Sequence, residues 1–329
     1  MKKILIIRFS SIGDIVLTTP VVRCIKKQHP DIAVHFATKS AYKGLLEHNP
    51  YIDKLHLLDR SLHKLIQELR DEDFDYVVDL HNNIRSQRVC LALLKRVGRV
   101  YKLNFAKWLL VNTKTNLLPP VHIVDRYMAA AEALEITNDK QGLDYFLPQG
   151  TSIGRFSFSG MLNSTPYIAW AIGGKHTTKI LPEDKVRNVC ALLKCPVVLL
   201  GDNNDKERGE AIASGLPHVI NATGQLNLHE SALVLRDAAV VVTNDTGLMH
   251  IAAALGKKIV SVWGSTVKEF GMYPYMPQAK FNYRTIEVND LDCRPCSKIG
   301  FKACPRKHFR CMREQDEQTI LNAINSFLG

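Results

Sequence analysis

The sequence has no apolar run of the roughly 20 residues that a membrane-spanning helix requires. Its opening residues, Met-Lys-Lys-Ile-Leu-Ile-Ile-Arg, place four apolar side chains before Arg8, too few for the core of a signal peptide. The loop after this first apolar run lacks G-x-G-x-x-G, and the chain lacks G-x-x-x-x-G-K-[ST]. These absences argue against a membrane-spanning helix and leave dinucleotide-binding and P-loop enzymes unsupported. We therefore expect a cytoplasmic protein.

The charge of the chain is strongly basic. Its 329 residues include 43 Lys and Arg against 32 Asp and Glu, a net charge of +11. This excess predicts an anionic partner: nucleic acid, acidic lipid headgroups or a phosphorylated glycolipid. Basic residues cluster at 85–99 and 298–313, although most are spread along the chain as on a solvated surface. The length predicts one large or two medium domains.

Short apolar segments alternate with helical patterns in both halves of the chain. In the first half the pattern predicts strands at 3–7, 32–37, 54–58 and 76–79, and helices at 20–28, 42–48, 62–71 and 124–134. In the second half it predicts strands at 167–171, 196–200, 218–221, 239–243 and 259–263, and helices at 182–193, 206–214, 228–236, 248–255 and 314–328. Residues 148–166 have the composition of a linker. Such alternation predicts an α/β protein built from parallel sheets.

We expect two Rossmann-like, doubly wound domains that face a cleft, because such domains bind ligands at the carboxyl ends of their strands. The predicted boundaries are 1–155 for the first domain and 156–312 for the second, which contains a cysteine-rich segment at 293–311. A final helix is expected within 313–329.

Residues 238–256 carry the clearest local signal. They predict a buried strand, an Asn-Asp-Thr-Gly turn and a helix of small residues that Gly256 ends. A helix N-terminus has unpaired N–H groups and partial positive charge, and Gly247 would let a phosphate approach closely. Alternatively, this is an ordinary connection in which Asp245 or Thr246 caps the helix.

Asp14 follows the first predicted strand, in the segment Arg8-Phe-Ser-Ser-Ile-Gly-Asp14. A carboxylate near a helix start stays ionised and can accept a proton from a sugar hydroxyl. The alternative interpretation is a capping residue.

A second polar segment, Asp79 to Arg88, follows another predicted strand and is expected to line the same cleft. Arg85 and Arg88 would bind acidic sugars through their planar guanidinium groups, or else are solvated residues beside a helix cap. Weaker candidates of the same kind are His122, Asp125 and Arg126. Glu207 is a candidate for the ribose of a nucleotide, or a surface residue of its helix.

Four cysteines, Cys293, Cys296, Cys304 and Cys311, follow one another at the spacing C-x2-C-x7-C-x6-C. This spacing predicts a structural zinc site, with free thiols or a redox pair as alternatives. Disulfides are not expected in a reducing cytoplasm. The remaining cysteines (Cys24, Cys90, Cys190 and Cys195) lie in apolar contexts and are predicted to be core residues.

Three segments in order carry a family resemblance: Ser-Ser-Ile-Gly-Asp-Ile-Val-Leu-Thr-Thr-Pro near the start, Lys179-Ile-Leu-Pro, and Asn-Asp-Thr-Gly-Leu-Met-His-Ile-Ala-Ala-Ala-Leu-Gly. Together they resemble glycosyltransferase family 9, the ADP-heptose:lipopolysaccharide heptosyltransferases. The resemblance extends from the first strand to about residue 275. It implies a GT-B fold with an acceptor-binding first domain and a nucleotide-sugar-binding second domain.

The resemblance also implies the reaction: inverting transfer of heptose from ADP-heptose to the inner core of lipopolysaccharide. By position, Asp14 matches the catalytic base and Lys179 the lysine that meets the donor diphosphate. The donor-binding residues expected in all are Lys179, Asp245, Thr246, Gly247, His250 and Glu207. The acceptor-binding residues expected are Ser11, Gly13, His81, Asn83, Arg85 and Arg88. Lysine charge and helix N–H groups together can stabilise a departing diphosphate, so catalysis demands no cofactor.

The expected partners are therefore ADP-heptose and an anionic glycolipid, Kdo-lipid A or the core oligosaccharide, at the inner face of the inner membrane. No nucleic acid is expected. Two alternatives remain: a glycosyltransferase that uses another nucleotide-sugar, and a basic nucleic-acid-binding protein with a zinc knuckle at its cysteine cluster.

Overall fold

The computed structural model describes residues 1–154, 156, 160 and 165–329, and the chain divides into two compact units. The first unit comprises Met1–Leu103 and Pro120–Phe146, and the second comprises Asn104–Pro119 and Leu147–Gly329. Residues 104–119 therefore pack with the second unit, although the sequence order assigned them to the first. Most of the predicted linker is described, but residues 155, 157–159 and 161–164, which hold the predicted domain boundary, lie outside the described residues.

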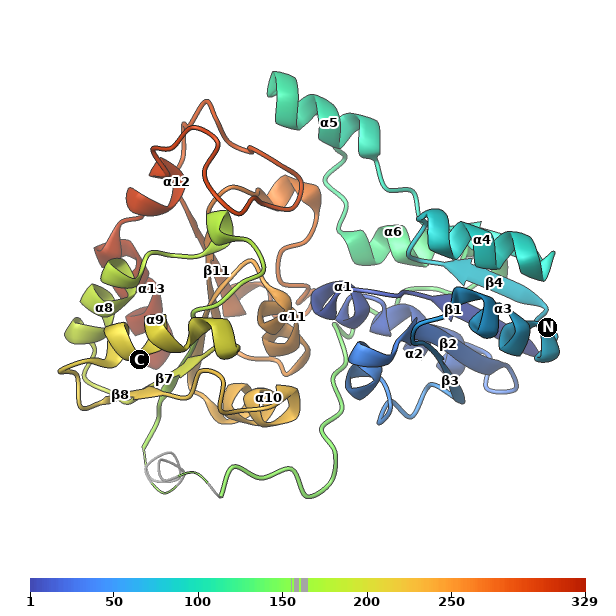
Figure 1. Cartoon of the computed structure of the whole chain (residues 1–329), viewed down its shortest axis with the longest axis horizontal. Helices are drawn as coiled ribbons and strands as arrows, with labels where there is room; N and C mark the ends of the chain where they lie inside the picture. The colour runs from blue at the N-terminus through green and yellow to red at the C-terminus, as the bar shows by residue number, and fades with distance from the viewer. Residues whose placement is uncertain (155, 157–159, 161–164) are drawn as a thin grey trace. The chain divides into compact units, whose positions relative to one another are not determined.

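The first unit contains a parallel sheet in the order β3-β2-β1-β4-β5 (Figure 1). Its strands are β1 (Lys3–Ile7), β2 (Ala33–Lys39), β3 (Lys54–Leu58), β4 (Tyr76–Asp79) and β5 (Arg96–Arg99). Its helices are α1 (Ile12–Val16), α2 (Thr19–Gln28), η1 (Ser40–Leu45), α3 (Leu62–Asp71), α4 (Ile84–Leu93), α6 (Ile123–Ala129) and η2 (Glu132–Leu134). Four successive residues of β1, from Ile4 to Ile7, are fully buried. Because successive residues face opposite sides, both faces of this sheet are covered.

The second unit contains a parallel sheet in the order β11-β10-β9-β6-β7-β8. Its strands are β6 (Ile168–Ala171), β7 (Val197–Leu200), β8 (Val219–Asn221), β9 (Val240–Asn244), β10 (Ile259–Trp263) and β11 (Tyr283–Glu287). Its α-helices are α5 (Asn104–Thr113), α8 (Glu183–Leu192), α9 (Lys206–Ala213), α10 (Leu228–Asp237), α11 (Gly247–Ala254), α12 (Arg310–Arg313) and α13 (Glu317–Leu328). Short 3-10 turns complete it: η3 (Thr177–Lys179), η4 (Asn203–Asp205), η5 (Lys268–Phe270) and η6 (Lys280–Asn282).

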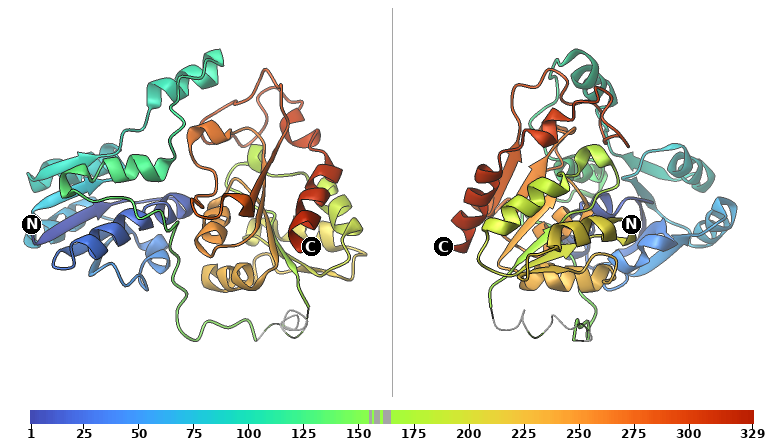
Figure 2. Two further views of the ribbon diagram at one scale, coloured as in Figure 1. Left: turned by 180° about the vertical axis from the view of Figure 1, so that it is seen from behind. Right: turned by 60° about the vertical axis from the view of Figure 1, so that its left-hand side comes forward.

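Helices cover both faces of this second sheet (Figure 2). Alternate strand residues such as Trp170, Val242 and Val262 pack with α8, α9 and α13 in one apolar core. On the opposite face, α11 contacts β9 and β10. The apolar strands predicted from the sequence are thus explained by burial on both sides.

Several elements differ from the sequence prediction. The segment expected as a helix at 42–48 is the 3-10 turn η1, and the helix expected at 124–134 ends as α6 at Ala129 before the turn η2. The edge strands β5 and β11 were not predicted, because they contain several polar residues and have a neighbour on one side only. Helix α5 was also missed; Leu110 seats it against Val267 and Phe270 in a small apolar cluster.

In each unit the strand order places two loops side by side: the loops after β1 and β4 in the first unit, and the loops after β6 and β9 in the second. In the first sheet the order reverses at β1 and β4, and in the second at β6 and β9. At such a switch point the connections leave on opposite sides and open a crevice at the carboxyl ends of the strands. The loop of Asp14 follows β1, and the loop of Asp245 follows β9. Both predicted sites therefore begin at a switch point of their own sheet.

Among the helices of the described residues, none has both the length and the apolar composition needed to span a bilayer.

Candidate functional sites of the two units

In the first unit, Asp14 lies in α1, directly after the end of β1. Its Oδ1 lies 2.5 Å from Arg8 Nη2, and its Oδ2 accepts hydrogen bonds from Ser11 Oγ at 2.7 Å and Ser11 N at 3.2 Å. The side chain keeps 23% of its surface exposed. Burial by itself raises the pKa of Asp14, but the charge of Arg8 and the Ser11 hydrogen bonds outweigh burial, so the pKa is lowered. Asp14 is therefore an ionised, partly accessible hydrogen-bond acceptor at neutral pH.

Arg8 is the residue that joins the two loops of this switch point. It is buried, and it donates from Nη1 to Leu80 O at 2.6 Å and from Nε to Ser10 O at 2.8 Å. Its guanidinium also lies 5.7 Å from the centre of the Tyr127 ring. No role was predicted for Arg8, although an arginine directly after an apolar strand was a visible signal in the sequence. Arg8 fixes the position of Asp14 relative to the loop after β4.

The loop after β4 is organised by Asp79, which is fully buried. Asp79 Oδ1 accepts from the amides of His81 and Asn82, and its Oδ2 accepts from Ser86 Oγ at 2.9 Å. Asn83 begins α4 as its N-cap, since its Oδ1 accepts from Ser86 N at 3.0 Å. Asn83 thus has the capping role, which restricts its side chain for any further contact.

His81 lies beside the Asp14 loop, with its ring edge-on to Phe9 at 5.6 Å between centroids. Its Nδ1 is buried and has no hydrogen-bond partner among the described residues. Burial, followed by the positive charges of Arg8 and Lys102, lowers the pKa of His81 to about 3. His81 is therefore a neutral imidazole whose buried nitrogen can meet a polar ligand.

The remaining acceptor-side candidates differ in environment. Arg85 and Arg88 are exposed on α4, and no ion pair to either is found among the described residues. Gly13 is buried inside α1 and Ser11 orients Asp14. Arg85 and Arg88 are thus available to an anion.

Three weaker candidates serve the fold of the first unit. His122 Nδ1 accepts from Val124 N at 3.1 Å as the N-cap of α6. Asp125 forms an ion pair with Lys140 at 3.1 Å. Arg126 is buried, and burial lowers its pKa.

In the second unit, Lys179 and the start of α11 come together at the β6/β9 switch point. Lys179 Nζ lies 2.5 Å from Asp245 Oδ2, which also accepts from Thr266 Oγ1 at 2.8 Å. Asp245 is therefore bound to these two side chains and does not cap α11. Thr246 occupies the N-cap position without a capping hydrogen bond from its side chain among the described residues; its Oγ1 lies 3.3 Å from Thr243 Oγ1. The first amides of α11 are thus not satisfied by a side chain at the cap.

Asn244 holds this arrangement in place. The side chain is buried, and its Oδ1 accepts from Leu181 N at 3.2 Å. Its Nδ2 donates to Ile172 O and Gly173 O, each at 3.2 Å. Asn244 therefore ties the end of β6 and the segment after Lys179 to the end of β9. This role of Asn244 was not predicted, although Asn244 is the first residue of the predicted Asn-Asp-Thr-Gly turn.

The other two candidates for donor binding, His250 and Glu207, differ in burial. His250 lies buried within α11, while Glu207 is exposed in the first turn of α9. The neighbouring Asp205 is buried instead: a Cβ atom at Gly173 would lie 2.1 Å from Asp205 Oδ2, and one at Gly201 2.7 Å. Asp205 thus requires glycine in the loops after β6 and β7. It was missed because a short acidic segment of a loop has no distinctive pattern.

The four clustered cysteines belong to the second unit, all are free, and Cys296 and Cys311 interact electrostatically with the other two thiols. No three of their sulfur atoms lie within 4.8 Å of one another in the described part of the chain. Burial and the neighbouring thiols raise the pKa of Cys296 to about 11 and that of Cys311 to about 12. The segment is anchored by Lys114, which donates to Pro295 O at 2.8 Å, and by Thr178, whose Oγ1 accepts from Phe301 N at 2.8 Å.

Comparison with known proteins assigns the chain to a family. Residues 62–302 match the model of "Glycosyltransferase family 9 (heptosyltransferase)". Lipopolysaccharide heptosyltransferase 1 of Campylobacter coli is 27% identical over 360 aligned positions, which cover 99% of each chain. Lipopolysaccharide heptosyltransferase 2 of Escherichia coli K12 is 25% identical over 296 positions, which cover 82% of this chain and 84% of the relative.

Solved structures share the fold over nearly the whole chain. A family 9 glycosyltransferase from Veillonella parvula has a TM-score of 0.79 at 20% identity, covering 99% of this chain and 97% of that chain. The E. coli heptosyltransferase WaaC with ADP has a TM-score of 0.71 at 19% identity, covering 98% of this chain and 99% of that chain. At these identities the likeness shows the fold alone.

Proposed function

The chain belongs to glycosyltransferase family 9, the heptosyltransferase family, and from this premise we propose that it transfers heptose from ADP-heptose to the inner core of lipopolysaccharide. The prediction of the family, and of a glycosyltransferase with a GT-B fold, is confirmed. The observation that carries the proposal is the family match together with the uncapped start of α11 beside Lys179. The relatives named above are lipopolysaccharide heptosyltransferases, which supports this choice of donor and acceptor.

The donor diphosphate is proposed to lie between Lys179 and the N-terminus of α11. Its phosphate oxygens accept from the first amides of α11, where the helix dipole favours negative charge. Lys179 supplies the positive charge that stabilises ADP as the bond to the anomeric carbon breaks. Asp245 orients Lys179 in advance, because their ion pair holds the ammonium group at the end of β9. Gly247 permits close approach, while Thr246 and His250 belong to the same turn and helix.

Asp14 is proposed as the general base. Its carboxylate accepts the proton of the acceptor hydroxyl while that oxygen attacks the anomeric carbon opposite the departing diphosphate, which inverts the configuration. The proton moves to Asp14, and the electron pair of the broken bond stays with ADP. Ser11 and Arg8 keep the carboxylate oriented and ionised. Proton transfer and charge stabilisation thus come from side chains and backbone amides, so the proposed reaction needs no cofactor.

The acceptor is proposed to be an anionic glycolipid, Kdo-lipid A or the core oligosaccharide. Arg85 and Arg88 are exposed and suit its carboxylates or phosphates, with His81 as a neutral neighbour. The net charge of +11 also favours peripheral binding to an acidic membrane surface. Flotation with vesicles containing anionic lipid tests this binding. We expect binding that weakens as salt rises, and its absence at low salt would contradict the membrane proposal.

The cysteine cluster is proposed as a structural zinc site, on the strength of its C-x2-C spacing and its position in one anchored loop. Elemental analysis of protein purified without added metal tests it. We expect this cluster to hold one zinc per chain, so that Cys293→Ser lowers the zinc content by one per chain. A protein without zinc that retains full stability and activity contradicts the proposal.

The transfer reaction itself is tested with purified protein, Kdo-lipid A and one nucleotide-sugar at a time. ADP-heptose should give a product with one added heptose, whereas UDP- and GDP-sugars should give none. The matched binding assay is a thermal shift, since a ligand that binds the native state raises its apparent stability. Product formation from a UDP- or GDP-sugar, with no shift from ADP, would establish the alternative donor.

A further inference from the structure

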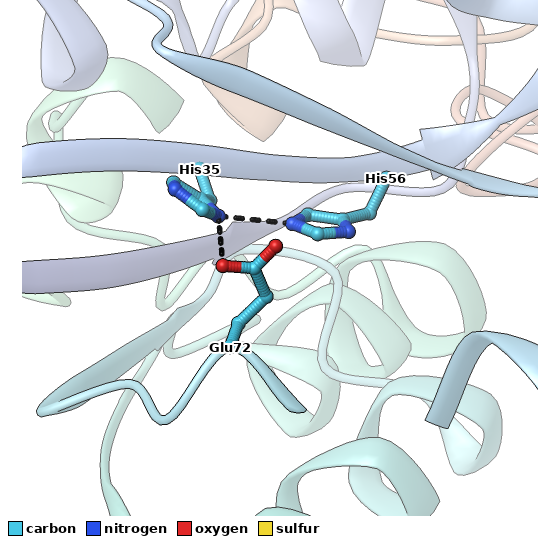
Figure 3. A group of neighbouring side chains, drawn as sticks. All are labelled: His35, His56 and Glu72. Carbon is cyan, nitrogen blue, oxygen red and sulfur yellow. Dashed lines mark hydrogen bonds and ion pairs between the residues drawn. The ribbon is translucent and has the colours of Figure 1, made fainter. Parts of the chain in front are cut away.

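Two histidines of the first unit meet inside the fold, away from Asp14. His35 on β2 and His56 on β3 are 5% and 0% exposed. Because Ala37 lies opposite His56 in the register of these strands, His35 and His56 share one face of the sheet, two positions apart. His35 Nδ1 lies 2.9 Å from His56 Nε2 (Figure 3), and Phe74 packs edge-on against both rings.

Two glutamates approach this pair from α3 and the residue after it. Glu72 Oε2 lies 3.8 Å from His35 Nδ1, and the two side chains point toward each other (Figure 3). Glu68 Oε1 lies 2.5 Å from His56 Nδ1. Because Nδ1 of His56 donates to Glu68, its Nε2 keeps a lone pair directed at His35. A carboxylate that fixes the far nitrogen of a ligand histidine in this way is typical of metal sites.

The spacing of the three inner atoms fits a transition-metal ion. An ion bound at about 2.0–2.1 Å to nitrogen and oxygen holds tetrahedral neighbours about 3.3 Å apart. The observed separations, 2.9 Å between the nitrogens and 3.8 Å to the carboxylate oxygen, lie on either side of that value. Shifts of about half an ångström would therefore seat the ion.

We propose that His35 Nδ1, His56 Nε2 and a Glu72 carboxylate oxygen form a binding site for a divalent transition-metal ion, for which zinc has the matching ligand set. The ion would connect β2, β3 and the end of α3, and so would stabilise the first unit. In the bound state the one ring proton of neutral His35 lies on Nε2, so that His35 Nδ1 and His56 Nε2 both offer lone pairs to the ion, whose two bonds replace the hydrogen bond between them. Water supplies a fourth ligand.

The ion must compete with two lysines for Glu72. Lys3 Nζ lies 2.9 Å from Glu72 Oε2, and Lys54 also forms an ion pair with this carboxylate. Lys3 retains a second acceptor, the backbone oxygen of Glu72 at 2.7 Å, when the carboxylate turns to a metal. Lys54 is half exposed and contributes mainly its charge. Removing Lys54 should therefore tighten metal binding without removing a ligand.

The experiment is isothermal titration of the chelator-treated full chain with Zn²⁺ and Co²⁺. The background is Cys293→Ser, Cys304→Ser, which separates this site from the cysteine cluster. We expect one ion per chain, a raised melting temperature, and a Co²⁺ absorption spectrum of tetrahedral type without thiolate bands. Glu72→Gln and His56→Asn should each abolish this binding, with circular dichroism to check that each variant is folded.

Two variants keep the test independent of folding. Lys54→Met should tighten binding by roughly fivefold. The control His63→Asn, at an exposed histidine on α3, should change nothing. The proposal is overturned if the background protein binds neither metal, if Glu72→Gln binds as well as the background protein, or if Lys54→Met shows no gain. The histidines would then be a hydrogen-bonded pair only.

Discussion

The neutral state of His81 provides a quantitative test of the site in the first unit. Its pKa is about 3 in the folded chain, against about 6.5 for an unperturbed histidine, because burial and then the charge of Arg8 disfavour the protonated ring. Between these values the unfolded chain binds a proton that the folded chain does not. His81 therefore contributes stability that is present above pH 6.5 and is lost as the pH falls toward 3.

The size of this loss follows from the two pKa values. A pH of 5 lies about 1.5 units below the pKa of histidine in the unfolded chain. The free energy of unfolding should therefore be roughly 2 kcal/mol lower at pH 5 than at pH 7.5. The variant His81→Gln carries no titrating group at this position. From pH 7.5 to pH 5, the free energy of unfolding should therefore decrease less in His81→Gln than in the wild type, and the two decreases should differ by roughly 2 kcal/mol.

Two measurements check this prediction. In an NMR titration of histidine-labelled protein, the His81 resonance is identified as the one that disappears in His81→Gln. This resonance should not shift between pH 7.5 and pH 5. Hydrogen exchange of β1 and β4 peptides reports unfolding of the first unit. Tryptophan fluorescence is the internal control, because Trp108, Trp170 and Trp263 all belong to the second unit. A His81 titration midpoint near 6.5, or equal pH dependence in variant and wild type, would refute the reasoning.

Three further predictions concern the proposed reaction. Asp14→Asn should lower kcat by about 10²–10⁴-fold with little change in the donor KM, because it removes the base and keeps the shape; steady-state kinetics showing less than a tenfold loss would contradict its role. Lys179→Gln should raise the donor KM by roughly 10–100-fold, the value of one charge-assisted hydrogen bond, and an unchanged KM would exclude the proposed phosphate contact. Asn244→Ala should destabilise the second unit by about 2–4 kcal/mol, because three backbone groups lose their partner. Urea unfolding followed by tryptophan fluorescence measures this loss. A decrease in the free energy of unfolding of less than about 1 kcal/mol would contradict the proposed role of Asn244.

The sequence predicted the sheets well because their strands are short, apolar and buried on both faces. The apolar patterns at 3–7 and 239–243 predict buried strands, and the structure has strands at Lys3–Ile7 and Val240–Asn244. Edge strands such as β5 escaped prediction because Arg-Val-Gly-Arg has too few apolar residues. The helical pattern of 42–48 folds instead as η1, since a short segment does not determine which type of turn it forms.

The sequence offers candidate site residues where a local motif carries the chemistry. Asp14, Lys179 and the turn at Asp245 stand out in the sequence by motif and order. Arg8 and Asn244 lie in these segments, but their roles were not predicted, because the roles depend on which strands are neighbours: Arg8 donates to Leu80 O, and Asn244 donates to Ile172 O. The order of strands in a sheet is a long-range property that local patterns do not specify.

The two interpretations of the Asp245 turn are also separated by long-range contacts. A cap would direct Asp245 or Thr246 at the amides of α11, but Asp245 binds Lys179 and Thr266 instead. Thr266 comes from the loop after β10, which sequence reasoning had no means of placing beside the turn. This contact leaves the helix start open to an anion, which is the basis of the proposed donor site.

The most direct measurement of this account is a crystal structure of the chain soaked with ADP. The account predicts a diphosphate within hydrogen-bonding distance of the amides of Gly247 and Leu248 and of Lys179 Nζ, with the Lys179–Asp245 contact lengthened. ADP bound elsewhere on the second unit, with the start of α11 empty and Lys179 still paired with Asp245, would contradict it.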